Sequence, residues 1–180
     1  MSQRSDSLLT AQLRELDTAL RKRKILYAAI GGLAVNAHGF IRATRDIDLM
    51  VMAEDADGAR ATALDLGYQL LDGGIEISSY VRGLQRFDVM HARREISRGL
   101  LARAADVDLD GMRIPVIPVE GLIGLKVQAY NDNPRRLQDV MDMIELFRVH
   151  GRTLNMDEVR SYFRLFDREK LLDDVLRAAR

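Results

Sequence analysis

Apolar residues in the first third of the chain alternate between helical and strand-like spacing. Leucines between residues 6 and 23 recur every three or four positions among charged residues, which predicts an amphipathic helix. The run "KILYAAIGG" predicts a short buried strand ended by the double glycine 31–32, and "LAVNAHGF" predicts a compact helix or turn closed by Gly39. "DIDLMVMA" then predicts a second strand, and "DADGARATALDLGY" predicts a helix closed by Gly67.

The middle of the chain is rich in strand patterns and the last third is helical. "YQLLD", "GIEISSYVRG" and "LQRFDVMHA" predict successive short strands separated by glycine-containing turns. After a polar helix, "RREISRGLLARA", the stretch "GMRIPVIPV" predicts an edge-type strand because prolines bound it. From Val119 onward the pattern is that of helices only, with Pro134 at a helix start.

This order of elements predicts an α+β fold with an α/β core, in which helices flank a small, mixed, twisted sheet and a helical part follows. The expected division is an N-terminal helix at 1–24 packed on the core, a core at 25–117 and a helical C-terminal subdomain at 118–180.

Charge and cysteine content narrow the class of protein. The chain has 180 residues, 47% of them hydrophobic, and its 27 Lys and Arg residues balance 27 Asp and Glu residues. A net charge of zero argues against a protein that coats nucleic acid by bulk electrostatics, although it leaves room for a local basic cleft. Because there is no cysteine, disulfides and thiolate metal sites are excluded and a reducing compartment is expected.

The start of the chain, "MSQRSDSLLTAQLRELD", lacks the apolar segment of a signal peptide. No apolar run approaches the roughly 18 residues needed to span a bilayer. We therefore expect a cytoplasmic protein without a membrane partner.

Two aspartates interrupt the second predicted strand. Because side chains alternate along a strand, Asp46 and Asp48 point to one face while Ile47 and Leu49 point into the core. Like charges this close are relieved by a cation, and Mg²⁺ prefers oxygen ligands. "QRFDVMHA" supplies a third acid, Asp88, between two apolar residues. If the two strands are neighbours, three carboxylates converge and could hold two Mg²⁺ ions for phosphoryl chemistry. The alternative is an acidic, solvated strand end.

The double glycine suggests a place for phosphates. Gly31 and Gly32 lie at a strand-to-helix junction, where bare main-chain N–H groups favour an anion and glycine permits close approach. A tight turn without a ligand is the alternative. A phosphate cradle followed by a carboxylate site for Mg²⁺ suits a nucleoside triphosphate (NTP).

Together these residues resemble the DNA polymerase β-like nucleotidyltransferase superfamily, which has a glycine-containing helix start, a D-x-D strand and a third acid on a neighbouring strand. The wider string "GGLAVNAHGFIRATRDIDLMV" is similar to the AbiEii-like abortive-infection toxins and related small nucleotidyltransferases. In that motif Arg42 and Thr44 precede Asp46 and Asp48. A second block, "PVEGLIGLKVQAYNDNPRRLQDVMDMIEL", is similar to a later motif of the same branch. Its matching positions are Lys126, Arg136, Asp139 and Asp142. The resemblance covers about residues 25–148.

The resemblance implies an enzyme that moves a nucleoside monophosphate from an NTP, such as ATP, onto a hydroxyl. Asp46, Asp48 and Asp88 would hold Mg²⁺, with Asp88 also assisting deprotonation of the acceptor, and Lys126 would contact the triphosphate. Arg42 and Arg86 could stabilise developing charge. The acceptor could be RNA such as tRNA, or a protein, and an antitoxin partner in a toxin–antitoxin or phage-defence system is an expectation of the branch.

Several alternatives stay open at this stage. Lys126 could be a solvated residue of an amphipathic helix, and Asp139 and Asp142 could be helix-surface partners of nearby arginines. Arg42 and Arg45 could simply pair with Asp46 or with surface acids. The whole chain could be a nucleotide-binding or interaction module without turnover, or a small-molecule transferase of the aminoglycoside-modifying kind. Such transferases usually have a larger acceptor domain, so the short helical C-terminus counts against this last alternative. The leucine-rich N-terminal helix could pack on its own domain or form a homodimer.

Overall fold

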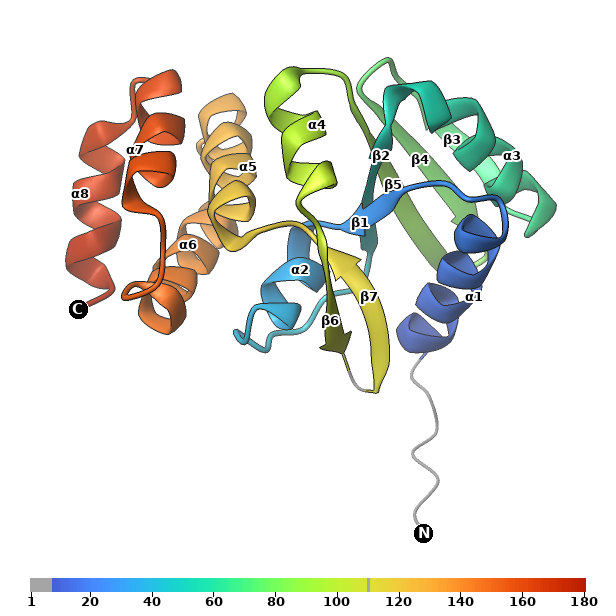
Figure 1. The fold of residues 1–180 in the computed structure, drawn as a ribbon, viewed down its shortest axis with the longest axis horizontal. Coiled ribbons are helices and arrows are strands. Elements are labelled where there is room, and N and C mark those ends of the chain that lie inside the picture. The colour runs from blue at the N-terminus through green and yellow to red at the C-terminus, as the bar shows by residue number, and fades with distance from the viewer. Residues whose placement is uncertain (1–7, 110) are drawn as a thin grey trace, which may run out of the picture. The chain divides into compact units, whose positions relative to one another are not determined.

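The computed structural model describes residues 8–109 and 111–180, whose helices and strands are labelled in Figure 1. They form two compact units. The first contains the chain up to Leu33 together with Ala43–Ile117, and the second contains Ala34–Arg42 together with Pro118–Arg180. None of the described helices is both long enough and apolar enough to cross a membrane.

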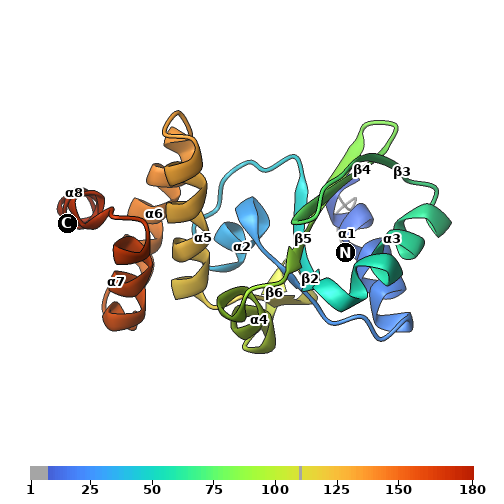
Figure 2. The ribbon, with the colours of Figure 1, turned by 90° about the horizontal axis from the view of Figure 1, so that it is seen from above.

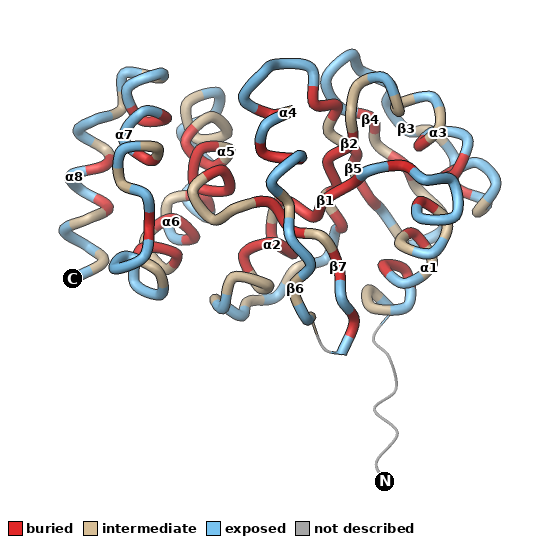
Figure 3. The backbone as a smooth tube through the Cα atoms, viewed as in Figure 1, coloured by how far each residue is buried: buried red, intermediate tan, exposed pale blue. Residues whose placement is uncertain are grey.

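Seven strands among the described residues form one mixed sheet in the first unit, in the order β3-β4-β5-β2-β1-β7-β6. β2 pairs with β5 in parallel, β1 pairs with β7 in parallel, and the remaining neighbours are antiparallel. The strands are β1 Tyr27–Ala29, β2 Ile47–Met52, β3 Gln69–Gly73, β4 Ile77–Arg82, β5 Gln85–Ala92, β6 Ala105–Leu109 and β7 Met112–Val116. The central strands β1 and β2 are largely buried, whereas β3 at the sheet edge is mostly exposed (Figure 3).

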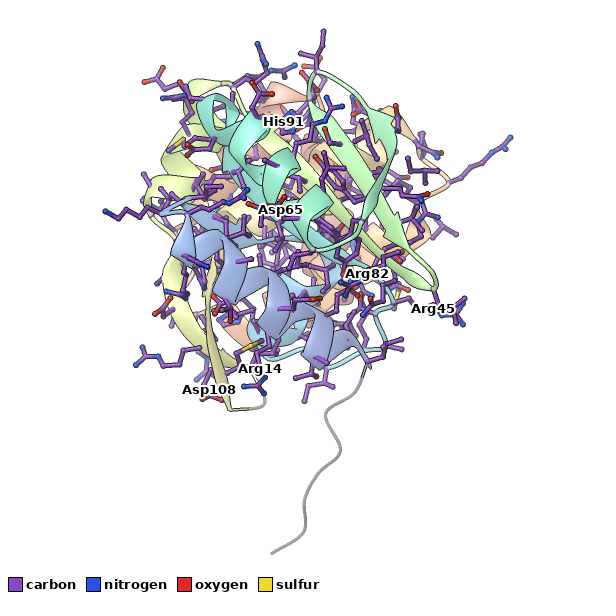
Figure 4. The ribbon with its side chains drawn as sticks, turned by 90° about the vertical axis from the view of Figure 1, so that its right-hand side faces the viewer. Arg14, Arg45, Asp65, Arg82, His91 and Asp108 are labelled. Atoms are coloured by element: carbon purple, nitrogen blue, oxygen red, sulfur yellow. The ribbon has the colours of Figure 1, made fainter. Side chains whose placement is uncertain are left out.

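Helices cover both faces of this sheet. α1 (Leu8–Lys22) and α3 (Ala56–Asp65) lie across one face, which is turned toward the viewer in Figure 4. α4 (Glu95–Ala102) lies on the opposite face, as the view from above shows (Figure 2). A short 3-10 turn, η1 (Ala53–Asp55), leads from β2 into α3. The predicted α+β class with a mixed sheet flanked by helices is confirmed.

The apolar stripe of α1 is covered by the first unit itself. Leu13, Leu16 and Leu20 are at most 3% exposed. The Gln12 side chain donates a hydrogen bond to the Arg86 carbonyl of β5 at 3.1 Å, and Arg82 of β4 pairs with Glu15. The leucine stripe of α1 is thus covered within its own unit, and a homodimer stays a prediction.

The second unit is a helical array. α5 (Val119–Asp132) packs against α6 (Leu137–His150) and α7 (Met156–Leu165), and α8 (Glu169–Ala178) packs against α6 and α7. The packing of α5 on α7 is close at Gly124, where an added Cβ would lie 2.8 Å from ring atoms of Tyr162. The Asn155 side chain accepts hydrogen bonds from two main-chain N–H groups and thereby caps the start of α7.

The structure corrects three details of the predicted elements. "GMRIPVIPV" forms β7, which lies inside the sheet between β1 and β6, so the edge-strand prediction was wrong. Pro115 is tolerated there because three-residue β1 pairs with β7 only at Ala29 and Val116. The edge is the unpredicted strand β6, whose exposed acids Asp106 and Asp108 disfavour further strand pairing. In addition, α6 begins at Leu137, after Pro134, and not at that proline. The double glycine does lie at the predicted strand-to-helix junction, where α2 (Gly31–Ala37) begins.

Candidate functional site

Gly31 and Asp48 are in close contact in the first unit. The Ile30 N–H donates a hydrogen bond to the Asp48 carbonyl at 2.9 Å, which brings the start of α2 beside β2. Gly31 has a φ of +60°, and a Cβ on it would lie 2.7 Å from the Asp48 Cγ and closer still to Oδ2. Both the backbone conformation and the carboxylate therefore require glycine at this position.

Asp48 and Asp88 are paired in register on the parallel strands β2 and β5. Their neighbours Ile47, Phe87 and Val89 are at most 3% exposed, so they point into the core, and both aspartates project from the opposite face. Neighbouring strands lie about 4.8 Å apart, so these two half-buried carboxylates are adjacent on one sheet face. The predicted neighbourhood of these two strands is therefore confirmed.

The third predicted carboxylate is less enclosed. Asp46 lies in the bend just before β2 and is exposed. Thr44 donates a hydrogen bond from Oγ1 to the main-chain carbonyl of Asp46 at 3.3 Å, which helps to shape this bend. Arg86, two residues before Asp88, projects from the same face of β5 and is exposed. Arg45 is also exposed and is labelled in Figure 4.

A polar residue that the sequence did not single out continues this face. Ser79 of β4 lies opposite Asp88 in the antiparallel pair β4–β5, so Asp48, Asp88 and Ser79 form a row across three strands. Ser79 is half-buried. Only the pairing of β4 with β5 reveals it, because a serine in a strand carries no signal of its own in the sequence.

The donor set suits Mg²⁺ in its chemistry, since it consists of carboxylate oxygens beside glycine main chain. Among residues 8–109 and 111–180, however, no three His, Asp or Glu side chains gather closely enough to hold a metal ion. Asp48 and Asp88 have the backbone placement of a shared site, and Asp46 would have to turn toward them.

The residues of the second predicted motif form a buried ionic network in the second unit. Lys126 is only 5% exposed, and its Nζ lies 3.0 Å from Asp139 Oδ1 and 2.6 Å from Asp142 Oδ2. Asp139 is 5% exposed and Asp142 is 0% exposed. Lys126 is therefore not solvated and the two aspartates do not lie on the helix surface, although Asp139 does pair with Arg136 as that alternative expected. The sequence did not predict this burial, because charged residues on a helix usually mark its solvated side, whereas α5 and α6 bury these three.

Two arginines complete the network. Arg42 binds the Asp142 carboxylate with both arms of its guanidinium, from Nε at 2.7 Å and from Nη2 at 2.8 Å. Arg136 pairs with Asp139 at 2.6 Å, and Gln138 donates a hydrogen bond to Asp142 at 2.9 Å. Burial alone raises the pKa of Asp142, but the hydrogen bonds from Arg42 and the charge of Lys126 outweigh it and hold that pKa below its usual value.

The predicted site residues thus fall into two groups. Gly31, Gly32, Thr44, Asp46, Asp48, Arg86 and Asp88 belong to the first unit, and Arg42, Lys126, Arg136, Asp139 and Asp142 belong to the second. In the first group the structure brings glycine main chain next to acidic side chains. In the second group it pairs the predicted phosphate-binding cations with carboxylates.

Several solved structures of known proteins are similar to this chain. No protein-family model and no curated protein sequence matches the chain. A solution structure of the antibiotic-resistance factor ANT(2'')-Ia superposes with a TM-score of 0.74 at 20% identity, covering 94% of this chain and 97% of that chain. A crystal structure of ANT(2'')-Ia in complex with adenylyl-2''-tobramycin gives 0.73 at 18% identity, covering 91% and 99%. The lincosamide antibiotic adenylyltransferase LnuA, with lincomycin bound, gives 0.52 at 17% identity, covering 63% and 82%. The chain therefore has the nucleotidyltransferase fold.

Proposed function

We propose that this protein transfers a nucleoside monophosphate from an NTP to a hydroxyl group of an acceptor. The observation that carries the proposal is the in-register pair Asp48 and Asp88 on one sheet face, with the main chain of Gly31 against Asp48. Carboxylates beside glycine main chain suit a metal-bound triphosphate. The nucleotidyltransferase fold supports the same chemistry.

Asp46, Asp48 and Asp88 are the residues that would hold Mg²⁺. Three carboxylates could hold two such ions. When bound, Mg²⁺ neutralises phosphate charge and makes the α-phosphorus more susceptible to attack. Gly31 is half-buried and Gly32 is buried, and neither carries a side chain, so the phosphates would approach the main chain from the exposed side of Gly31. Arg86 would contribute positive charge near the same face, and Thr44 would hold the bend that carries Asp46.

Asp88 has the role of general base in this proposal. Its carboxylate makes no hydrogen bond or ion pair with another residue of the described chain, and it lies between Asp48 and Ser79. Asp88 would accept the proton of the acceptor hydroxyl as the oxygen bonds to the α-phosphorus. The bond between the α-phosphorus and its bridging oxygen would break, and pyrophosphate would leave with that electron pair.

The acceptor divides the proposal into two candidates. The AbiEii-like motifs favour an RNA such as tRNA, or a protein, within a toxin–antitoxin or phage-defence system that includes an antitoxin. A small-molecule acceptor is favoured by one observation: the likeness spans 97–99% of the ANT(2'')-Ia chains. The expectation that a small-molecule transferase needs a larger acceptor domain is therefore wrong for that protein.

Transfer of label from α-³²P-NTPs tests the proposal. The protein, each NTP and Mg²⁺ would be incubated separately with total RNA, with a protein lysate and with an aminoglycoside. Label in one acceptor, lost on chelation with EDTA, would support transfer and identify the acceptor class. Binding of Mg²⁺·NTP without label in any acceptor would favour a module without turnover, and absence of binding would contradict the proposal.

A further inference from the structure

The buried network of the second unit has an unusual charge balance. Its fully enclosed members are one cation, Lys126, and two carboxylates, Asp139 and Asp142. A buried carboxylate without a full partner is costly, because burial removes the water that would solvate it. Lys126 alone cannot neutralise both acids, so the core of α5 and α6 needs a second cation.

Arg42 supplies that cation from outside the two helices. It reaches Asp142 over a sequence separation of 100 residues, with two hydrogen bonds in the fork geometry that only arginine offers. Its side chain is 21% exposed, so the guanidinium lies partly inside the unit. Arg136 meets the other acid, Asp139, but its side chain is 56% exposed.

The main chain of Arg42 is fixed as well as its side chain. Asn36 of α2 donates a hydrogen bond from Nδ2 to the Arg42 carbonyl at 2.9 Å, and its Oδ1 accepts one from the Arg42 N–H at 3.0 Å. Arg42 is thus held at both ends, by Asn36 through its backbone and by Asp142 through its guanidinium.

Arg42 lies close to Asp46 in the sequence, so fixing Arg42 affects where Asp46 can lie. Arg42 lies within the segment that leads from Gly31-Gly32 to Asp46, and only four residue steps separate it from Asp46. Four extended residues reach at most about 14 Å. Fixing Arg42 therefore restricts where Asp46 can go, and Asp46 is the proposed carboxylate with the fewest constraints of its own.

We propose that Arg42 and Asp142 anchor the segment that carries Asp46, that Lys126 neutralises the buried acids of this anchor, and that none of the three binds the triphosphate. Arg42, Lys126 and Asp142 are positioning residues in this assignment. Its consequence for nucleotide binding rests on the proposed function, whereas the anchor itself does not.

The contacts of Lys126 argue for the same assignment. To reach a phosphate, Nζ would have to leave two carboxylates at 3.0 and 2.6 Å and expose both of them unpaired. A lysine that serves as a mobile point charge for phosphate is expected to be accessible, but this one is 5% exposed.

Amide hydrogen exchange of residues 40–48 in the full-length protein, without ligand, tests the anchor directly. Arg42→Lys keeps the charge but loses the fork, so we expect exchange in this segment to rise about tenfold or more. The matched control is Arg148→Lys, which alters an exposed Arg–Glu pair on α6 and should leave exchange at 40–48 unchanged. Unchanged exchange in Arg42→Lys would overturn the anchor.

Mg²⁺·ATP and the other Mg²⁺·NTPs, titrated by calorimetry, test the role of Lys126. The double variant Lys126→Met with Asp139→Asn removes one cation and one anion together and leaves the Arg42–Asp142 pair intact. We expect it to keep its affinity for the nucleotide within about threefold, whereas loss of a charged phosphate contact would cost tenfold or more. A loss of that size with normal exchange at 40–48 would overturn our assignment of Lys126.

The two proposals fail in different ways. If the wild-type protein binds no nucleotide, the proposed function fails, and the exchange experiment still decides whether Arg42 anchors the segment. If the wild-type protein binds nucleotide but Arg42→Lys changes neither exchange nor affinity, the anchor fails and the proposed function stands.

Discussion

Gly31 and Asp48 lie so close together that a Cβ on Gly31 would be 2.7 Å from the Asp48 Cγ. One residue begins a helix and the other sits in the parallel strand pair, and the sequence separates them by a full helix and loop. This contact links the two features that suggested a nucleotide site in the sequence, the double glycine and the D-x-D strand. A substitution of Gly31 should therefore change both the stability of the protein and its binding of nucleotide.

Gly31→Ala should destabilise the protein and abolish binding of Mg²⁺·NTP. The left-handed backbone conformation costs about 1–2 kcal/mol for alanine, and displacement of the Asp48 carboxylate adds about 1–3 kcal/mol to the loss. Urea unfolding measures the first effect and calorimetric titration the second.

Gly83→Ala is the matched control, because Gly83 also has a φ of +60° but has no atom within 4 Å of an added Cβ. It should show only the backbone cost and retain nucleotide binding. Equal losses of stability in both variants would mean that Asp48 moves aside without cost.

The alternation of apolar and acidic residues was enough to predict the face of Asp48 and Asp88, but not that Asp46 lies in the bend before β2. Ile47 and Leu49 flank Asp48, and Phe87 and Val89 flank Asp88, so the period of two assigns both acids to the face opposite the core. The neighbour of Asp88 on β4, Ser79, could not be predicted, because strand register depends on the hairpin turn and on packing.

Gly124→Ala tests the packing of the second unit. In the interior of α5, alanine would gain up to about 1 kcal/mol of helix propensity. Its Cβ would meet the Tyr162 ring at 2.8 Å, and overpacking of this kind costs about 1–3 kcal/mol. We therefore expect a net loss of stability in urea unfolding.

The comparison for this variant is Gly99→Ala in α4, where an added Cβ has no atom within 4 Å. Helix propensity acts alone at this position, so the protein should gain about 0.5–1 kcal/mol. A gain in both variants would show that Tyr162 yields without cost.

Asp142→Asn should lower the free energy of unfolding at pH 7 by about 3–5 kcal/mol, because it leaves Lys126 and Arg42 without their shared carboxylate. The pKa of Asp142 is depressed in the folded protein, so the unfolded chain takes up the proton first as the pH falls. The advantage of the wild type is thus complete above the unfolded pKa, near 3.8, and is lost as the pH falls through the lower folded pKa.

Urea unfolding of both proteins between pH 7 and pH 3 measures this dependence. Glu145→Gln on the same helix disrupts a pair with the exposed Arg148 and should change stability by less than about 1 kcal/mol at any of these pH values. A difference between wild type and Asp142→Asn that does not shrink in acid would contradict the depressed pKa.

The ionic network shows where sequence patterns stop being informative. Lys126 and Asp142 lie on amphipathic-looking helices, where charged residues usually mark the solvated side. Asp142 binds both Lys126 and Arg42, which lies 100 positions before it, and a pairing of that range leaves no periodic signal. β6 was not predicted either. Its alternating acids belong to an exposed edge strand, which lacks the apolar residues of a core strand.

Asp88→Asn tests the central claim, with Asp106→Asn on the exposed edge strand as the same substitution in the same sheet. We expect Asp88→Asn to bind Mg²⁺·NTP within about threefold of the wild type, because Asp46 and Asp48 remain. Loss of the general base should reduce transfer of α-³²P label to the acceptor by about 100-fold or more. Asp106→Asn should transfer label at the wild-type rate. Transfer by Asp88→Asn at the rate of Asp106→Asn would contradict the assignment of this carboxylate to the reaction.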